Sequence, residues 1–412
     1  MAETALQERI SSKAMRFWCL LAAITIYAFW GTPRPDSPGG VEVVAGLLLI
    51  TAAGLPQAAR ALIPVGGAGW RQMGSLLLLY GLTVPVLTGI FAGNSPSGML
   101  RDIVPFLFLL MPVFLYPFFT QDRPERYWDG LLWLTGAVVL LGLVFSSRVL
   151  LPVYPELARF QPVSVSDPFL LANAPTVLFS ALLLIGLCGW SLYRGDLFKS
   201  AVCIVLAVVP LVTMALITQR ASIGAVCLSI VVLLSLGIVR RPLRMVWPLI
   251  LLAGGVMAYW PVIADITQNL MRKTSIVGFN MRWQEARAVM EVLSGSLWTV
   301  LFGKGWGATV ASPAVGGAVV NFTHSLLTTY WLKTGLVGLG FVLAYLVRIG
   351  LILLPLFYRY PVVALALAGP FLIDILLYAS FKSLDFGLIL LLIVSWGVRT
   401  DLLHRASGYS IE

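Results

Sequence analysis

His324 is the residue of this sequence best suited to proton transfer. The chain contains two histidines, His324 and His404, and an imidazole can exchange a proton near neutral pH. His324 ends a polar stretch in the segment NFTHSLLTTYWLKTGLVG, before a long apolar run. An interfacial histidine that only bonds the backbone would fit the same position. The sequence therefore offers His324 as a candidate general base and gives His404, near the C-terminus, no comparable setting.

Two arginines could compensate the charge of a phosphate. Arg220 stands at a turn between apolar runs, and Arg282 lies near the start of the amphipathic stretch NMRWQEARAVMEVLSG, residues 280–295. A guanidinium offers planar, paired donors that match phosphate oxygens. With Asn280 as the helix cap, Arg282 falls in the first turn, where free backbone N–H groups favour an anion. A snorkelling Arg220 and a surface helix meeting lipid headgroups would leave the same pattern.

Other polar features are expected to be structural. FGKGWG, residues 302–307, lacks the spacing of a P-loop and is expected to be a loop turn. Asp374 stands alone in an apolar helix, and a carboxyl paired with Lys382 or an arginine is favoured over a proton relay. The four cysteines lie in apolar segments without CxxC spacing, as buried residues do. The acidic residues predicted to face outward are scattered, so neither a metal site nor a cofactor is expected.

The composition identifies what must position these residues. Hydrophobic residues make up 59% of the 412 residues, charged residues make up 11%, and the mean hydropathy is +0.92. A soluble globule, a disordered chain and an outer-membrane barrel of alternating strands are excluded. The continuous apolar runs predict an all-α polytopic membrane protein with about twelve helices. Their expected ranges are 16–33, 41–58, 75–93, 101–120, 129–147, 168–191, 199–219, 221–239, 244–262, 335–356, 361–380 and 384–400.

The basic residues predict the orientation. With the N-terminus inside, sixteen Lys and Arg residues fall on the cytoplasmic side and six in the short outer loops. Both termini are therefore expected to be cytoplasmic, and this distribution gives no reason to expect nucleic-acid binding. The chain divides into helices over 1–262, a long outer loop with the amphipathic helix over 263–334, and the last helices with a short tail over 335–412.

These residues together resemble the bacterial O-antigen ligases of the O-antigen ligase/polymerase superfamily. His324-Ser325, nine residues and then Gly335-Leu-Val-Gly338 is similar to the ligase signature H-(N/S/Q)-x9-G-x-x-G. Arg220-Ala-Ser-Ile-Gly224 resembles the R-x3-G element, and Arg282-Trp283 followed by FGKGWG resembles the loop element. The order of these elements and the large loop before the tenth predicted helix also agree.

The resemblance implies a membrane-embedded glycosyltransferase of the GT-C-like type in the bacterial inner membrane. Its donor would be O-antigen on undecaprenyl diphosphate, and its acceptor a sugar hydroxyl of the lipid A–core oligosaccharide on the periplasmic side. The reaction would be an inverting displacement without metal or cofactor. His324 would be the base and Arg220 and Arg282 the diphosphate ligands. Further contacts to phosphate, core or sugar are expected from Arg159, oriented by Glu156, and from Trp283, Trp306 and Phe322, although these aromatic residues fit the membrane interface equally well.

Three rivals stay open. An O-antigen polymerase would share the arginines, but the histidine signature favours the ligase. A protein O-oligosaccharyltransferase has a similar histidine motif and often an extended periplasmic domain, which a chain ending soon after its last helix disfavours. A secondary transporter would predict internal repeats and charges near the midplane, and only Asp374 fits that pattern.

Overall fold

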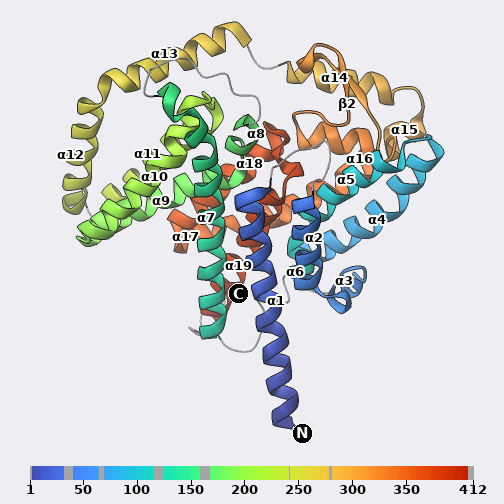
Figure 1. Cartoon of the computed structure of the whole chain (residues 1–412), viewed down its shortest axis with the longest axis horizontal. Coiled ribbons are helices and arrows are strands. Elements are labelled where there is room, and N and C mark those ends of the chain that lie inside the picture. The colour runs from blue at the N-terminus through green and yellow to red at the C-terminus, as the bar shows by residue number, and fades with distance from the viewer. Residues whose placement is uncertain are drawn as a thin grey trace.

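The computed structural model describes residues 2–31, 40–64, 69–115, 124–157, 168–240, 242–277 and 281–406, and these are almost entirely helical (Figure 1). The helices are α1 (Ala2–Trp30), α2 (Gly40–Ala53), α3 (Leu55–Ala61), α4 (Gly69–Phe91), α5 (Pro96–Leu109), α6 (Met111–Leu115), α7 (Pro124–Leu157), α8 (Pro168–Ala172), α9 (Pro175–Arg194), α10 (Leu197–Leu216), α11 (Arg220–Arg240), α12 (Pro242–Ala258), α13 (Trp260–Val277), α14 (Arg282–Leu293), α15 (Leu297–Phe302), α16 (Leu326–Gly350), α17 (Leu353–Arg359), α18 (Pro361–Leu376) and α19 (Leu384–Ala406). Between them lie the strands β1 (Val310–Ser312) and β2 (Ala318–Val320) and the 3-10 turns η2 (Pro313–Val315) and η3 (Ala379–Lys382).

Each apolar run predicted to be helical overlaps an observed helix, but some runs are broken. The run 41–58 divides into α2 and α3, which are bent by 80° relative to each other. Gly54 at this bend has a φ of 71°, and Pro56 stands at the start of α3. Proline fits the first turn of a helix but lacks the N–H needed further in, so the chain starts a new helix here.

The membrane-spanning character is carried by the longer helices. Of the described residues, six helices are long and apolar enough to cross a bilayer, or up to eight if each bent pair forms one span. Shorter apolar helices run over Ala14–Trp30 and Pro361–Leu376. The chain is therefore an all-helical protein compatible with a lipid bilayer, while the count of about twelve spans stays a prediction.

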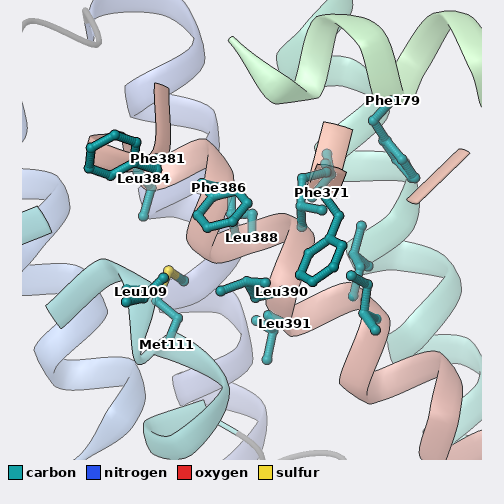
Figure 2. Close-up of a cluster of buried hydrophobic side chains, with 14 of the residues drawn as sticks. Leu109, Met111, Phe179, Phe371, Phe381, Leu384, Phe386, Leu388, Leu390 and Leu391 are labelled. Carbon is teal, nitrogen blue, oxygen red and sulfur yellow. The ribbon is translucent and has the colours of Figure 1, made fainter. Parts of the chain in front are cut away.

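The helix α19 forms the centre of the core. Phe386, Leu388, Leu390 and Leu391 are fully buried, and Figure 2 shows them among side chains of the surrounding helices. A Cβ atom at Gly387 would lie 2.3 Å from the carbonyl oxygen of Phe108, so glycine lets α19 approach α5 closely. Such small-residue contacts are a common basis of helix association in membranes, where lipid is as apolar as the core.

A small layer of short elements covers one side of the long helices. In Figure 1, α13 and α14 run across the top of the view, and α1 descends away from them. The strands β1 and β2 pair antiparallel with Val310 opposite Val320, joined through Gly316 and Gly317 at φ values of 69° and 83°. This hairpin departs from the expected all-helical pattern, because its glycine turn and short valine-containing strands are too brief to stand out in an apolar sequence.

The amphipathic helix α14 packs against this layer. Val289 and Leu293 on α14 are fully buried and cluster with Ala308, Val310 and Leu332. The apolar face of α14 therefore lies on protein. This packing places α14 next to the beginning of α16.

Gly335 breaks α16 and receives the glycine turn of residues 302–307. Its φ of 67° lies in the left-handed region, and a Cβ atom there would lie 2.2 Å from the carbonyl oxygen of Leu301. The turn docks on the broken helix because Lys304 N–H donates to Leu332 O at 2.9 Å and Gly305 N–H donates to Lys333 O at 3.0 Å. α16 begins at Leu326, nine residues earlier than predicted. Its first half therefore directly follows the segment that carries His324.

Candidate functional site

His324 is bound by a carboxylate. Its ring Nδ1 lies 3.0 Å from both Oε1 and Oε2 of Glu285, and its backbone N–H donates to Oε2 at 3.2 Å. Glu285 belongs to α14, whereas His324 lies between β2 and α16. The packing of α14 on the hairpin and on α16 therefore brings the two residues together.

Glu285 is held as an anion. The side chain is 2% exposed, and the hydroxyl of Ser312, at the end of β1, donates a hydrogen bond to its Oε1. Burial by itself raises the pKa of this carboxyl, but the hydrogen bonds from His324 and Ser312 outweigh burial, so the pKa of Glu285 lies below its ordinary value. An ionised carboxylate only accepts, so Nδ1 of His324 carries the hydrogen facing it.

The other ring nitrogen of His324 is consequently available. In a neutral imidazole with its hydrogen on Nδ1, Nε2 bears the lone pair. The side chain of His324 is 38% exposed, so substrate can approach. This arrangement can accept a proton at Nε2 and stabilise the resulting imidazolium through Glu285.

The backbone before His324 is fixed by hydroxyl groups and by Arg101. The N–H of Thr323 donates to Oγ1 of Thr329 at 3.0 Å, and the Thr323 hydroxyl shares a hydrogen bond with that of Thr329 at 2.9 Å. With its amide oxygen facing Arg101, Asn321 accepts from Nε at 2.7 Å and from Nη2 at 3.0 Å. The first turn of α16 and the start of α5 thus both restrain the segment that carries the histidine.

Arg282 and Arg220 lie close enough to influence each other. The guanidinium of Arg282 is within electrostatic range of Arg220, Glu285 and Tyr378. Burial lowers the pKa of Arg282, Tyr378 and Glu285 oppose this effect, and Arg220 adds to it. The Nε atom of Arg282 is buried without a hydrogen-bond partner. Two guanidinium groups within electrostatic range of each other, one with an unused donor, form a setting that favours an anion.

The N-terminus of α14 adds to this setting. The expected cap, Asn280, lies outside the described residues, and Met281 takes the N-cap position with a φ of 48° and no side-chain hydrogen bond to the helix. Arg282 is the first helical residue, as the sequence predicted to within the first turn. Its charge therefore lies at the positive end of the helix dipole.

Tyr378 connects this arginine pair to α11. Its side chain forms a hydrogen bond with Ser222 in the first turn of α11 and lies within electrostatic range of Arg220 and Asp374. Asp374 is buried and borders a small recess that is also lined by Tyr378, Ser222 and Gln219. Lys382, a suggested partner of Asp374, instead forms an ion pair with Asp102.

The predicted aromatic contacts separate into different environments. Trp283 is 80% exposed, and Phe322 is half-buried with its ring centroid 4.6 Å from Nζ of Lys382. Trp306 is buried, and its indole N–H donates to the Gly81 carbonyl oxygen at 2.7 Å, so its ring belongs to the packing against α4. Sugar stacking by Trp283 or Phe322 stays a prediction. Arg159 lies outside the described residues, as does the side chain of Glu156.

A buried charged cluster links the helices near the site. Lys333 of α16 pairs with Asp102 of α5 and donates to the Ala308 carbonyl oxygen at 2.7 Å. The same Asp102 oxygen accepts from the backbone N–H of Gly307 at 2.7 Å. The cluster therefore joins α5, α16 and the glycine turn.

The helical pattern of the sequence contains one signal that points to Glu285. Glu285 lies one helical turn before Val289 and two before Leu293, on the face that the apolar residues define. A carboxylate on the buried face of an amphipathic helix needs a partner. Nothing in the sequence indicated that Ser312 and His324 would be those partners, because the contact depends on the hairpin.

Among the described residues, no group of three or more His, Cys, Asp or Glu side chains could hold a metal ion. No protein-family model matches the chain, and no curated protein matches it either.

Proposed function

We propose that the protein is a membrane glycosyltransferase that moves a glycan from a lipid diphosphate to a sugar hydroxyl. The observation that carries the proposal is the Glu285–His324 pair, which leaves Nε2 available, beside Arg282, which is itself within electrostatic range of Glu285 and Arg220. The resemblance of the His324, Arg220 and Arg282 segments to O-antigen ligases names the substrates. The donor is O-antigen on undecaprenyl diphosphate, and the acceptor is the lipid A–core oligosaccharide.

In the proposed reaction, Nε2 of His324 takes the proton of the acceptor hydroxyl. The acceptor oxygen forms a bond to the anomeric carbon while the bond from that carbon to the diphosphate oxygen breaks. The attack comes from the face opposite the leaving group, so the anomeric configuration inverts. Glu285 keeps Nδ1 protonated and stabilises the imidazolium, a role that makes it a positioning residue.

The arginines act on the leaving group. As the glycosidic bond breaks, the diphosphate gains the electron pair and therefore negative charge, which Arg282 and Arg220 counter. Removing one preorganised electrostatic contact of this kind typically costs about 3 kcal/mol, or about a hundredfold in rate. Half-burial of Arg282 strengthens its contribution because the surrounding protein screens charge less than water does.

The proposal places the site on the periplasmic face of a bacterial inner membrane. The excess of basic residues in the segments expected inside supports cytoplasmic termini, and α14 and the hairpin then lie outside. A diphosphate lipid and a core glycolipid displayed on that face would both reach His324.

The experiment that tests the function compares acceptors. Purified protein in detergent receives undecaprenyl-diphosphate O-antigen and, in parallel reactions, rough lipopolysaccharide or an acceptor protein, with EDTA present and no ion gradient. The proposal expects capped lipopolysaccharide. Lengthening of the lipid-linked glycan alone would favour a polymerase, and transfer only to added protein would favour a protein O-oligosaccharyltransferase. No glycan product with any acceptor would contradict the proposal and favour a transporter, which would then show gradient-dependent flux.

A further inference from the structure

An apolar groove lies between α2, α3, α4, α5 and α6. Its cavity is about 890 Å³, within the size range of binding sites for small molecules. Aliphatic and aromatic side chains such as Leu49, Leu82 and Phe108 line it, and its charged lining residues are Glu42, Arg101 and Lys382. A long apolar wall with charge confined to a few positions matches an amphiphile better than a polar metabolite.

Lys382 is the unusual member of this lining. Its side chain is 7% exposed, and Nζ is buried without a hydrogen-bond partner. Its nearest carboxylate oxygen is Oδ1 of Asp102 at 3.6 Å, and the other oxygen of that carboxylate already binds Lys333. One carboxylate thus faces two buried lysines, with Arg101 next to it in the chain. A further anion near Lys382 would satisfy its unused donors.

The two basic residues that line the groove contact the segment that precedes His324. Arg101 faces the amide of Asn321, and Lys382 lies over the ring of Phe322 at 4.6 Å. These two contacted residues precede His324 by three and two positions. A phosphate held by Arg101 and Lys382 would therefore lie against the segment that positions the proposed base.

We propose that this groove holds the hydrocarbon chain of the polyprenyl carrier, with Arg101 and Lys382 contacting the phosphate attached to that chain. The choice of lipid rests on the proposed function. A lipid whose phosphate lies next to the His324 segment would be positioned as a reactant, and the proposed reactant is the polyprenyl carrier. Apolar walls give the chain a protein environment similar to the bilayer, and the two cations fix where the chain ends. The phosphate attached to the sugar then extends toward Arg220 and Arg282.

The experiment measures binding without transfer. Undecaprenyl monophosphate, which carries no sugar, is titrated onto the purified full-length protein in detergent, and bound lipid is counted by native mass spectrometry. Lys382→Gln removes a charge, and Gly46→Phe fills the groove from α2, where a Cβ atom would meet nothing within 4 Å. The matched controls are Lys199→Gln at an exposed lysine and Gly254→Phe at another glycine with open space.

The proposal expects Lys382→Gln and Gly46→Phe each to weaken undecaprenyl phosphate binding about tenfold, the equivalent of one charge-assisted hydrogen bond. Both controls are expected to bind as wild type does. Wild-type affinity in Gly46→Phe would overturn the groove assignment even if Lys382→Gln failed to fold. Displacement of the probe by an equal concentration of phosphatidylglycerol would overturn the carrier assignment.

Failure of this inference is separable from failure of the function. Groove-dependent binding without any glycan transfer would remove the ligase proposal and leave a polyprenyl-phosphate site. Normal transfer by Gly46→Phe with unchanged probe binding would remove the groove assignment and leave the ligase proposal intact.

Discussion

The carboxylate of Glu285 accepts hydrogen bonds from both the ring and the backbone of His324, across a separation of thirty-nine residues. The double contact fixes the ring as well as the chain that carries it. Because Glu285 is buried and also bonded by Ser312, its orientation depends on the hairpin remaining packed on α14. The geometry assigns proton acceptance to Nε2 of His324 and positioning to Glu285.

Replacing Glu285 by Gln is expected to lower the kcat of glycan transfer about a hundredfold with little change in KM, because the neutral amide no longer stabilises an imidazolium. Steady-state kinetics with varied acceptor measures this separation. Glu285→Asp should recover part of the rate because it keeps the charge. Glu291→Gln, at an exposed position of the same helix, serves as control. An unchanged kcat in Glu285→Gln would argue against the positioning role.

The lowered pKa of Glu285 predicts a dependence of stability on pH. A carboxyl whose pKa is lower in the folded than in the unfolded state binds fewer protons when the protein is folded. Its contribution to the free energy of unfolding is therefore fully present above the unfolded pKa of about 4.3 and is lost as the pH falls through the folded pKa. Thermal unfolding between pH 3 and 7, compared with Glu285→Gln, measures this contribution. The prediction would be contradicted if the unfolding temperature of the wild type changed with pH in the same way as that of Glu285→Gln over this whole range.

Arg282→Gln is expected to lower kcat/KM about a hundredfold, because the diphosphate loses one guanidinium contact in the transition state. The exposed Arg287 on the same helix provides the matched variant Arg287→Gln, which should transfer glycan normally. Inorganic diphosphate is the second readout, since it should inhibit wild type more strongly than Arg282→Gln. Equal losses in the two arginine variants would indicate a general effect of surface charge.

Gly335→Ala is expected to destabilise the protein by about 2 kcal/mol or more, because alanine disfavours a positive φ and its Cβ would meet the Leu301 carbonyl. Gly340→Ala in the same helix has open space at its Cβ position and should be neutral or stabilising. Thermal unfolding in detergent compares the two. If both variants unfolded at the wild-type temperature, Gly335 would have no special conformational role.

The sequence predicted the all-helical character because long apolar runs leave few alternatives to a helix, while among the described residues six to eight spans are long and apolar enough to cross a membrane. It also placed Arg282 in the first turn of α14, although Met281 and not the expected Asn280 takes the N-cap position. The break at Gly335 was less accessible. A helix that stops and resumes at one glycine depends on the turn of residues 302–307 docking there, a contact between segments distant in the chain.

In the site too, the sequence indicated some residues, whereas others depend on contacts between distant segments. His324, Arg220 and Arg282 stood out because only 11% of the residues are charged and the chain has two histidines. Glu285 and Ser312 did not, because their role follows from the packing of α14 on a hairpin that sequence periodicity did not indicate. Trp306 was expected to contact sugar or to lie at the membrane interface, but its ring is buried against α4, between Gly305 and Gly307, which both have positive φ values.

The most direct measurement of the central claim is the single-turnover rate of glycan transfer by His324→Ala, beside His404→Ala at the chain's other histidine. Both variants are assayed with undecaprenyl-diphosphate O-antigen and rough lipopolysaccharide, after equal yield and thermal stability are established. We predict a loss of at least about a hundredfold in His324→Ala and wild-type transfer in His404→Ala. Transfer at the wild-type rate by His324→Ala would contradict the assignment of His324 as the base.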